Sequence, residues 1–264
     1  MSHYPQTGRW TACRACGRHV HRSQWGPFQQ CPYCHHWQRL TATERLALLV
    51  DPDSWQPLAM PERPSNQLAF PGYDQKLQQA AQQTTATEAV VTGTAKINGY
   101  PAVLAVMDSH FMMGTLNTVV TRRIVTASQT AQRQAIPLII VTASGGARMQ
   151  EGLYALVGMN LILAELQRLA ASQIPLITVL TDPTMGGVSA SFAFKVDLVV
   201  AEAGAKIGFA GARVIQQTMP VDLPADFQTA ASLMTHGMLD AVIERPRMRA
   251  YLANALAAYG LRGH

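Results

Sequence analysis

The chain has 264 residues and a formal net charge of +5; 48% of its residues are hydrophobic and 14% are charged. This length and composition exclude a disordered chain and are sufficient for one large globular domain together with a small one. No run of about 18 uninterrupted apolar residues occurs, and the first residues contain no apolar leader, so we expect a cytoplasmic protein without a membrane span.

The four cysteines of the chain form one cluster, Cys13-x-x-Cys16 followed by Cys31-x-x-Cys34. Two such turns can place four thiolates around a tetrahedral zinc ion, at about 2.3 Å from the metal. Disulfides are disfavoured in a reducing cytosol, so they and a redox role are the weaker alternatives. We expect a zinc ribbon over residues 10–38, with one structural Zn²⁺ per chain and no open coordination position.

The basic charge of the chain is concentrated at this end. Up to position 45 a single acidic residue, Glu44, stands against six arginines. Such a segment favours an anionic partner, and one alternative function is therefore a zinc-ribbon protein that binds nucleic acid through its phosphates. The arginines are Arg9, Arg14, Arg18, Arg22, Arg39 and Arg45.

Residues 39–87 are expected to connect the ribbon to the main domain. Thr41 and Glu44, three positions apart, form a capping box, which predicts a helix over residues 41–49. Five prolines follow between positions 52 and 71 without a sustained hydrophobic period, which indicates a surface connector. A second helix is predicted over residues 73–83.

From residue 88 to residue 264 strand patterns alternate with helix patterns, which predicts an α/β domain. It begins with a hairpin around an Asn98-Gly99 turn. No G-x-G-x-x-G motif follows the first strand, so a dinucleotide-binding fold is not indicated. The strands are expected at 88–97, 100–107, 137–142, 175–181, 196–201 and 206–209, and the helices at 116–134, 148–171, 187–194, 213–218, 227–235 and 246–259.

An apolar strand that ends in a pair of glycines occurs twice. The strand over 137–142 is followed by Gly145-Gly146, and a similar strand over 175–181 is followed by Gly186-Gly187. Two glycines allow a sharp bend, so backbone amides, among them those of Gly146 and Ala147, can face a ligand where the next helix starts. Fixed amides stabilise negative charge that develops on an oxygen, as in a thioester enolate.

The pattern does not indicate a nucleophile or a base. Ser144 does not lie in a G-x-S-x-G motif, and no histidine or aspartate is marked out as a partner for Ser189 or Ser191. We therefore expect the last two to be hydroxyls at a helix start. Glu151 lies in the first turn after the glycines, where a carboxylate complements the helix dipole more often than it acts as a base.

Arginines near the glycine turns could bind the phosphates of a bulky substrate. For each of them the alternative is a surface arginine or an ion-paired one. The candidates are Arg148, Arg122, Arg123 and Arg213.

Five motifs follow one another along the chain: the cysteine pairs at 13–16 and 31–34, SGGARMQE at 144–151, TDPTMGGVSASF at 181–192 and IGFAGARVI at 207–215. Together they resemble the β-subunit family of bacterial acetyl-CoA carboxylase carboxyltransferases. The resemblance extends over nearly the whole chain. It implies a crotonase-like spiral of ββα units with an N-terminal four-cysteine zinc ribbon.

The resemblance implies a biotin-dependent carboxyltransferase subunit for fatty acid biosynthesis. Such an enzyme transfers the carboxyl group from carboxybiotin, on a biotin carboxyl carrier protein, to acetyl-CoA and forms malonyl-CoA. Carboxybiotin is thought to release carbon dioxide, after which the biotin anion takes the methyl proton of the thioester, so the cofactor supplies the base. The implied partners are a homologous α subunit in an α2β2 assembly, the carrier protein and a biotin carboxylase.

The resemblance also assigns site residues by motif position. The two glycine pairs are the expected oxyanion-binding groups, with the thioester bound on this subunit. The catalytic residues are therefore expected to be Gly186, Gly187, Gly145 and Gly146. The expected substrate-binding residues are Arg148, Arg122, Arg213, Ala147 and Met185.

One segment departs from the family pattern. At 111–118 many members have a more glycine-rich sequence, and here Met113 and Asn117 add bulk. This change could alter the pocket and the acyl preference, so a carboxyltransferase for another acyl-CoA is a further alternative. A stand-alone crotonase-type hydratase or isomerase is another; it would need a positioned carboxylate near the amides, for which Glu151 is the only near candidate.

Overall fold

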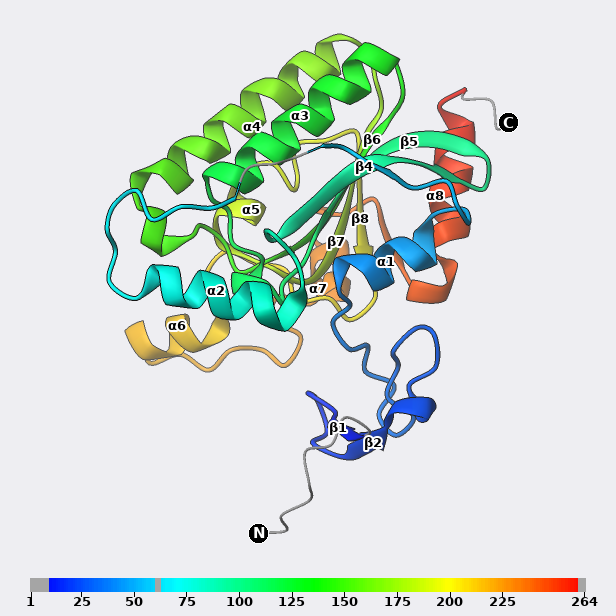
Figure 1. The fold of residues 1–264 in the computed structure, drawn as a ribbon. Coiled ribbons are helices and arrows are strands. Elements are labelled where there is room, and N and C mark those ends of the chain that lie inside the picture. Colours follow the sequence, from blue (N-terminus) through cyan, green and yellow to red (C-terminus); the bar gives the residue numbers. More distant parts are fainter. Residues whose placement is uncertain (1–9, 60–62, 261–264) are drawn as a thin grey trace. The chain divides into compact units, whose positions relative to one another are not determined.

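The structure, a computed structural model, describes residues 10–59 and 63–260 (Figure 1). The chain forms two units, one up to Leu40 and one from Thr41 onward. The first unit contains a short antiparallel hairpin, β1 (Trp10–Ala12) and β2 (His19–His21), followed by the 3₁₀ helix η1 (Arg22–Gln24). Its small apolar cluster consists of Cys13, Val20, Trp25 and Cys31.

The second unit is built around a seven-stranded sheet. The first three strands are antiparallel, and from β5 to β9 all neighbours are parallel. β3 and β9 were not predicted, because segments of two or three residues are too short to show a period. In sheet order the strands are β3 (Gln56–Pro57), β4 (Val90–Ile97), β5 (Tyr100–Met107), β6 (Leu138–Ser144), β7 (Leu176–Thr184), β8 (Leu198–Glu202) and β9 (Ala241–Ile243).

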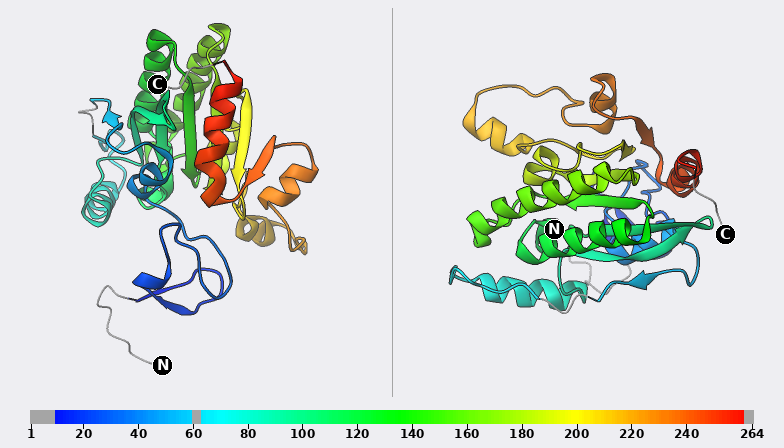
Figure 2. Two further views of the ribbon diagram at one scale, coloured as in Figure 1. Left: turned by 90° about the vertical axis from the view of Figure 1, so that its right-hand side faces the viewer. Right: turned by 90° about the horizontal axis from the view of Figure 1, so that it is seen from above.

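Helices cover both faces of this sheet (Figures 1 and 2). α2, α3 and α4 contribute to the core on one face, and α1 and α8 to the core on the other. The helices are α1 (Ala42–Leu49), α2 (Tyr73–Thr84), α3 (Thr118–Gln134), α4 (Leu153–Ala171), α5 (Gly186–Ala190), α6 (Ala212–Thr218), α7 (Ala230–Thr235) and α8 (Met248–Ala258), with 3₁₀ turns η2 (Met112–Gly114), η3 (Met149–Glu151) and η4 (Arg245–Arg247).

The central strands β6 and β7 are buried at nearly every position because both faces of the sheet are covered. Successive side chains of a strand point to opposite faces. Accordingly, Leu138 and Ile140 of β6 lie in the core under α3 and α4, whereas Ile139 and Val141 lie in the core under α1 and α8. The continuous apolar run in the sequence is thus divided between two cores.

The segment 39–87, which the sequence indicates as a connector, contributes to the second unit. Thr41 caps α1 as predicted, since its side chain accepts from the amide of Glu44 while the Glu44 carboxylate accepts from the amide of Thr41. Leu49 of α1 and Tyr73 of α2 are buried in the two cores of the sheet domain. Both helices are therefore part of the folded domain.

Helix α4 is long and apolar enough to cross a membrane by length and composition alone. In this fold it packs beside α3 (Figure 1), and 33% of its most apolar window is buried. Ile162 and Leu166 point into the core, whereas Leu153 and Val157 are exposed. The helix therefore buries one side in this unit and leaves an apolar side uncovered.

A buried ion-pair cluster joins α1, β8 and η4. Glu202 at the end of β8 pairs with Arg45 of α1 and with Arg245 of η4, whose Nη2 lies 2.6 Å from Oε1 of the carboxylate. These side chains are at most 6% exposed. Burial opposes the ionisation of Glu202, but the two guanidinium groups lower its pKa to about 2. The cluster ties the beginning and the end of the domain to one strand.

We expect Glu202→Gln to lower the free energy of unfolding by roughly 3–5 kcal/mol at neutral pH, because two buried guanidinium groups lose their counter-charge. The measurement is urea unfolding of both proteins. Because the folded protein lowers this pKa from 4.5, the stabilisation is complete above pH 4.5 and is lost as the pH falls toward about 2.

The difference between the two proteins should therefore shrink in acid. Asp222→Asn, which changes an exposed carboxylate, should have little effect at any pH. A loss for Glu202→Gln that is equally large in strong acid would contradict the electrostatic explanation.

Candidate functional site

The two strands that end in glycine pairs, β6 and β7, are parallel neighbours. Leu138 pairs with Leu176, so the residues that repeat in the sequence lie side by side in the sheet. An irregularity follows, after which Ser144 pairs with Thr184, because β7 contains two additional residues in this interval. The pairing brings the two glycine turns together at the carboxyl ends of the strands.

The two glycine turns are in backbone contact. An ideal Cβ on Gly186 would lie 2.9 Å from the Cα of Gly146, and one on Gly146 would lie 3.3 Å from the amide nitrogen of Gly187. Gly146 and Gly186 also have positive φ values of 115° and 59°. A side chain at either position would be strained and would push the turns apart, so both positions require glycine.

Three of the four glycine amides that the sequence predicts as catalytic donate within the protein. Gly145 donates to the carbonyl oxygen of Met113 at 2.8 Å, and Gly146 donates to Oγ of Ser144 at 3.1 Å. Gly186 donates to a carbonyl oxygen in the loop after β8 at 2.9 Å. These amides hold the turns in place.

The amides of Gly187 and Ala147 have no acceptor within hydrogen-bonding distance among residues 10–59 and 63–260. Gly187 is the second residue of α5, where a helix offers an N–H group no internal partner. The Ala147 nitrogen lies 3.6 Å from the position of an ideal Cβ on Gly187, and both residues are half-buried. Two unoccupied donors thus lie side by side, an arrangement that can stabilise an oxyanion.

Ala147 lies in a bend and not at the helix start that the sequence predicts. The expected helix from residue 148 begins only at Leu153, after η3. Ala147 instead forms a parallel bridge with Leu116, whose amide donates to the carbonyl oxygen of Gly146 at 2.8 Å. In a parallel bridge, one residue of the pair bonds to the residues before and after its partner. Leu116 therefore bonds to the neighbours of Ala147, and the amide of Ala147 itself makes no bond in this pairing.

Arg148, predicted to bind substrate phosphates, is buried beneath this bend. Its Nη2 lies 2.6 Å from Oε1 of Glu88 and its Nη1 lies 2.9 Å from Oε2, while Nη2 also donates to the carbonyl oxygen of Thr115 at 3.0 Å. Burial disfavours the charge of Arg148, but the charge of Glu88 raises its pKa above the ordinary value. This guanidinium has no exposed surface and anchors the bend instead of meeting a phosphate.

A second carboxylate, Glu151, lies in the same network. It accepts from the hydroxyl of Tyr73 at 2.7 Å and from the side-chain amide of Asn117 at 2.8 Å. It also accepts from the backbone and the hydroxyl of Thr118 at 3.0 and 2.9 Å. Burial raises the pKa of Tyr73 to about 12, so the phenol remains a donor. With four donors, the Glu151 carboxylate is engaged in structure and is not positioned as a base.

The two bulky residues of segment 111–118 lie in different surroundings. Asn117 is buried at the start of α3, and its side-chain amide donates to both Glu88 and Glu151 at 2.8 Å. Met113 has a φ of 58°, is 48% exposed and lies over the turn at Gly145. Only Met113 therefore faces the surface beside the paired turns.

The other predicted substrate-binding residues lie in different places. Met185 is half-buried between the turns, and its amide donates to the carbonyl oxygen of Ser144 at 2.9 Å. Arg122 is exposed on α3, and its neighbour Arg123 is buried. The side chain of Arg213 lies outside the described part of the structure. Ala147 and Met185 are thus the predicted substrate-binding residues whose backbone lies in the paired turns beside Gly187.

The serines of these motifs stabilise backbone groups. Ser189 donates to the carbonyl oxygen of Gly208 at 2.7 Å, and Ser191 donates to that of Gly187. Ser144 is buried and accepts from the bend, as described above. Ser189 lies within α5 and Ser191 directly follows it, so neither stands at the helix start that the sequence predicts, although both hydroxyls bond to backbone groups.

A separate cluster lies in the first unit. The Sγ atoms of its four cysteines all lie within 4.8 Å of one another, and the thiols are free. The distance is 3.6 Å between Cys13 and Cys34 and 3.9 Å between Cys16 and Cys31. Sulfur atoms about 2.3 Å from a tetrahedral zinc ion would be about 3.8 Å apart. The four cysteines could therefore hold one metal ion.

Comparison with known sequences gives consistent matches. The carboxyl transferase domain family model matches residues 35–236. The chain is 71% identical over 261 residues to two proteins named acetyl-coenzyme A carboxylase carboxyl transferase subunit beta 1, from two strains of Lactiplantibacillus plantarum, covering 99% of this chain and 98% of each of theirs. It is 46% identical over 257 residues to the acetyl-coenzyme A carboxylase carboxyl transferase subunit beta of Pelotomaculum thermopropionicum. This match covers 97% of this chain and 90% of the relative.

Solved structures share the fold. The transcarboxylase 12S core with hydrolysed methylmalonyl-coenzyme A bound matches with a TM-score of 0.69 and 26% identity. The match covers 83% of this chain and 41% of the transcarboxylase chain, so this chain spans less than half of that protein. The Pseudomonas malonate decarboxylase heterodimer matches in fold, with a TM-score of 0.62 and 22% identity over 84% of this chain and 86% of that one. The α/β crotonase-like fold that the sequence predicts is confirmed.

Proposed function

Because the chain belongs to the carboxyl transferase family, as a β subunit of acetyl-CoA carboxylase carboxyl transferase, we propose that it transfers a carboxyl group from carboxybiotin on a carrier protein to acetyl-CoA. The product is malonyl-CoA, used in fatty acid biosynthesis. The observation that carries this proposal is the pair of unoccupied amides, those of Ala147 and Gly187, where the two glycine turns meet.

In this proposal the thioester oxygen of acetyl-CoA accepts from both amides. Removal of a methyl proton converts the thioester into an enolate, whose negative charge develops on that oxygen. Donors that are fixed before the reaction stabilise such a charge with little reorganisation. The bonds of Gly145, Gly146 and Gly186 and the buried Arg148 keep the two donors in position.

The arrangement supports a reaction in which this chain supplies no base. The nearest predicted base, Glu151, is buried and saturated by hydrogen-bond donors, which also disfavours a stand-alone hydratase or isomerase. When bound, biotin would supply both the carboxyl group and the base. The residues of this chain then orient the thioester and hold its oxygen.

An exposed apolar surface beside the amides supports a partner subunit. On η3 and α4, Met149 and Leu153 are each 70% exposed and Leu161 is 55% exposed. The helix borders the site, since an ideal Cβ on Gly187 would lie 2.5 Å from Sδ of Met159. Contiguous apolar surface of this kind marks an interface. We place a homologous α subunit on this α4 face, in an α2β2 assembly.

The remaining partners follow from the reaction. Carboxybiotin must be delivered by a biotin carboxyl carrier protein and regenerated by a biotin carboxylase, and we place all of them in the cytoplasm. The arginine-rich first unit could contact nucleic acid, but that role leaves the paired glycine turns without a use and is not favoured.

We assign zinc to the four cysteines. The sulfur–sulfur distances of 3.6 and 3.9 Å suit a tetrahedral thiolate site. Four protein ligands leave no position for a substrate, so the ion would stabilise the first unit and take no part in the transfer.

Gly187→Val tests the oxyanion site. Its Cβ would stand 2.5 Å from Sδ of Met159 and 3.6 Å from the Ala147 nitrogen, so a branched side chain here would crowd the two amides. We expect biotin carboxylation from malonyl-CoA, measured with the α subunit present, to fall by at least about 100-fold. Gly211→Val, at a position with open space around it, should stay active.

Zinc content should be unchanged in both variants. Near-normal turnover of Gly187→Val would contradict the site, and an inactive wild-type complex with every cognate α subunit would contradict the function.

Cys31→Ser should remove zinc from the first unit, because three thiolates hold the ion much less tightly than four. The measurement is the metal content of the purified chain. His35→Asn changes an exposed neighbour that has a positive φ of 59° and should retain one zinc ion. A Cys31→Ser chain with a full complement of zinc would show that the thiolates are not the ligands.

Val157→Asp places a charge in the middle of the α4 face. We expect the dissociation constant for the α subunit to rise at least about tenfold, because an unpaired carboxylate would be buried in the interface. Analytical ultracentrifugation measures this. Gln134→Asp, at an exposed position of α3, is the control, and equal affinities of all three proteins would place the interface elsewhere.

A further inference from the structure

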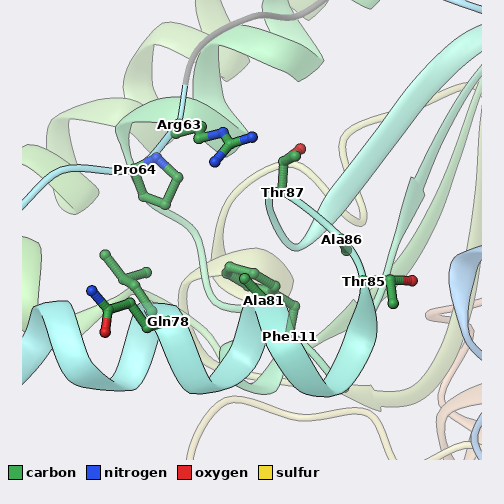
Figure 3. A pocket seen from close by; sticks show the side chains of 9 residues that line it. Arg63, Pro64, Gln78, Ala81, Thr85, Ala86, Thr87 and Phe111 are labelled. Carbon is green, nitrogen blue, oxygen red and sulfur yellow. The ribbon is translucent and has the colours of Figure 1, made fainter.

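Two pockets of the sheet domain lie in different places. One lies beside α2 and has Arg63 and Phe111 in its wall (Figure 3). The other has residues of α5 and α7 in its wall, together with Phe209 and Gln228. Phe209 connects this second wall to the oxyanion site, because its carbonyl oxygen accepts from the amide of Gly186 at 2.9 Å.

The loop that contains Phe209 holds the second glycine turn. This loop, residues 206–210, follows β8 and is named the β8 loop below. Its Ile207 forms a parallel bridge with Thr184 at the end of β7. Two residues further along each segment, the carbonyl oxygen of Phe209 accepts from Gly186. The next amide after that of Gly186 is one of the two unoccupied donors, so the β8 loop determines where this donor is placed.

Gln228 holds the β8 loop from the side away from the turn. Its carbonyl oxygen accepts from the amide of Ile207 at 2.9 Å, and its Nε2 donates to the carbonyl oxygen of Ala210 at 2.7 Å. Its side chain crosses the loop at Gly208, where an ideal Cβ would collide with Nε2, Cδ and Cγ of the glutamine. Gln228 is therefore bonded to the loop on both sides of Phe209.

Two further observations indicate that these bonds position the Phe209 carbonyl. The ring of Phe209 is 69% exposed, so packing of the side chain fixes the residue only weakly. Gln228 is half-buried and has a φ of 56°, in the left-handed region that non-glycine residues adopt rarely. Such a conformation persists where the surrounding contacts maintain it, and it is common beside functional sites.

We propose that Gln228 is a positioning residue for the oxyanion site. It holds the carbonyl group of Phe209, which holds Gly186, so that the amide of Gly187 points with that of Ala147 at the thioester oxygen. It acts through the β8 loop and not by contact with the substrate. This inference rests on the proposed function, because it takes the two amides as the donors to the enolate.

Gln228→Ala removes the side-chain bond to the β8 loop. In the complex with the α subunit, kcat for biotin carboxylation from malonyl-CoA should fall at least about tenfold, since a displaced donor stabilises the oxyanion less well. The KM for malonyl-CoA should change by less than about twofold, because the lost interaction is made in the transition state.

Gln173→Ala is the matched control. Gln173 is also a glutamine with a positive φ, of 55°, so the exchange for alanine has the same backbone setting. It is exposed and precedes β7, at the end of the strand opposite to the glycine turn. This variant should keep the wild-type kcat and KM.

Gly208→Ala tests the same contact from the other side. The three heavy atoms nearest to its new Cβ all belong to Gln228, so the methyl group should displace the glutamine and lower kcat as Gln228→Ala does. In the double variant the methyl group meets no glutamine, and kcat should stay within about twofold of the lower single variant. Losses that multiply would show that the two residues act independently and would overturn the proposal.

Hydrogen exchange of the Gly186 amide provides a measurement that needs no activity. In the full chain this amide should exchange at least about tenfold faster in Gln228→Ala and in Gly208→Ala than in wild type, because its acceptor is no longer held in place. Gln173→Ala should exchange as wild type does.

The outcomes separate this inference from the proposed function. If Gln228→Ala keeps the wild-type kcat in an active complex, raises only KM, or leaves the exchange of Gly186 unchanged, the positioning role is overturned and the carboxyltransferase stands. If the wild-type complex carboxylates no biotin but both variants accelerate the exchange of Gly186, the link from Gln228 to the turn stands and the proposed function fails.

Discussion

The parallel pairing of β6 with β7 is the constraint on which the rest of the site depends. It places Gly146 against Gly186 and sets the amides of Ala147 and Gly187 side by side. This register cannot slip by one residue, because Leu138 would then move from one core to the other and the sheet is buried on both faces. The position of two small donors is thus determined by the packing of two whole cores.

Buried charges complete this framework. Arg148 and Glu88 hold the bend that carries Ala147, and Glu151 holds the start of α3 beside it. On the far side of the domain Glu202 joins segments from both ends of the chain. Glu88 and Glu151, the two carboxylates bound to this bend and to the start of α3, are both engaged in such contacts. An enzyme whose cofactor supplies the base can use its carboxylates in this way, because none of them has to remain free for proton transfer.

The surroundings of the amides suggest a site that this chain forms only in part. The α4 face is apolar and exposed in the described part of the chain, which suits a second subunit. In the proposed arrangement this chain holds the thioester and a partner on the α4 face completes the site. Charge stabilisation and assembly then depend on two different groups of residues, which can be tested separately.

The sequence by itself determined the features that depend on local spacing. It located the main strands and helices, the two glycine turns, the capping box at Thr41 and the four clustered cysteines, since each follows from neighbouring residues. Only the tertiary structure decided which amides are available, because two additional residues in β7 place Ala147 and not Gly145 beside Gly187. It also decided that Arg148 is structural: its partner, Glu88, lies 60 residues away in the chain, and no local pattern reports a contact over that separation.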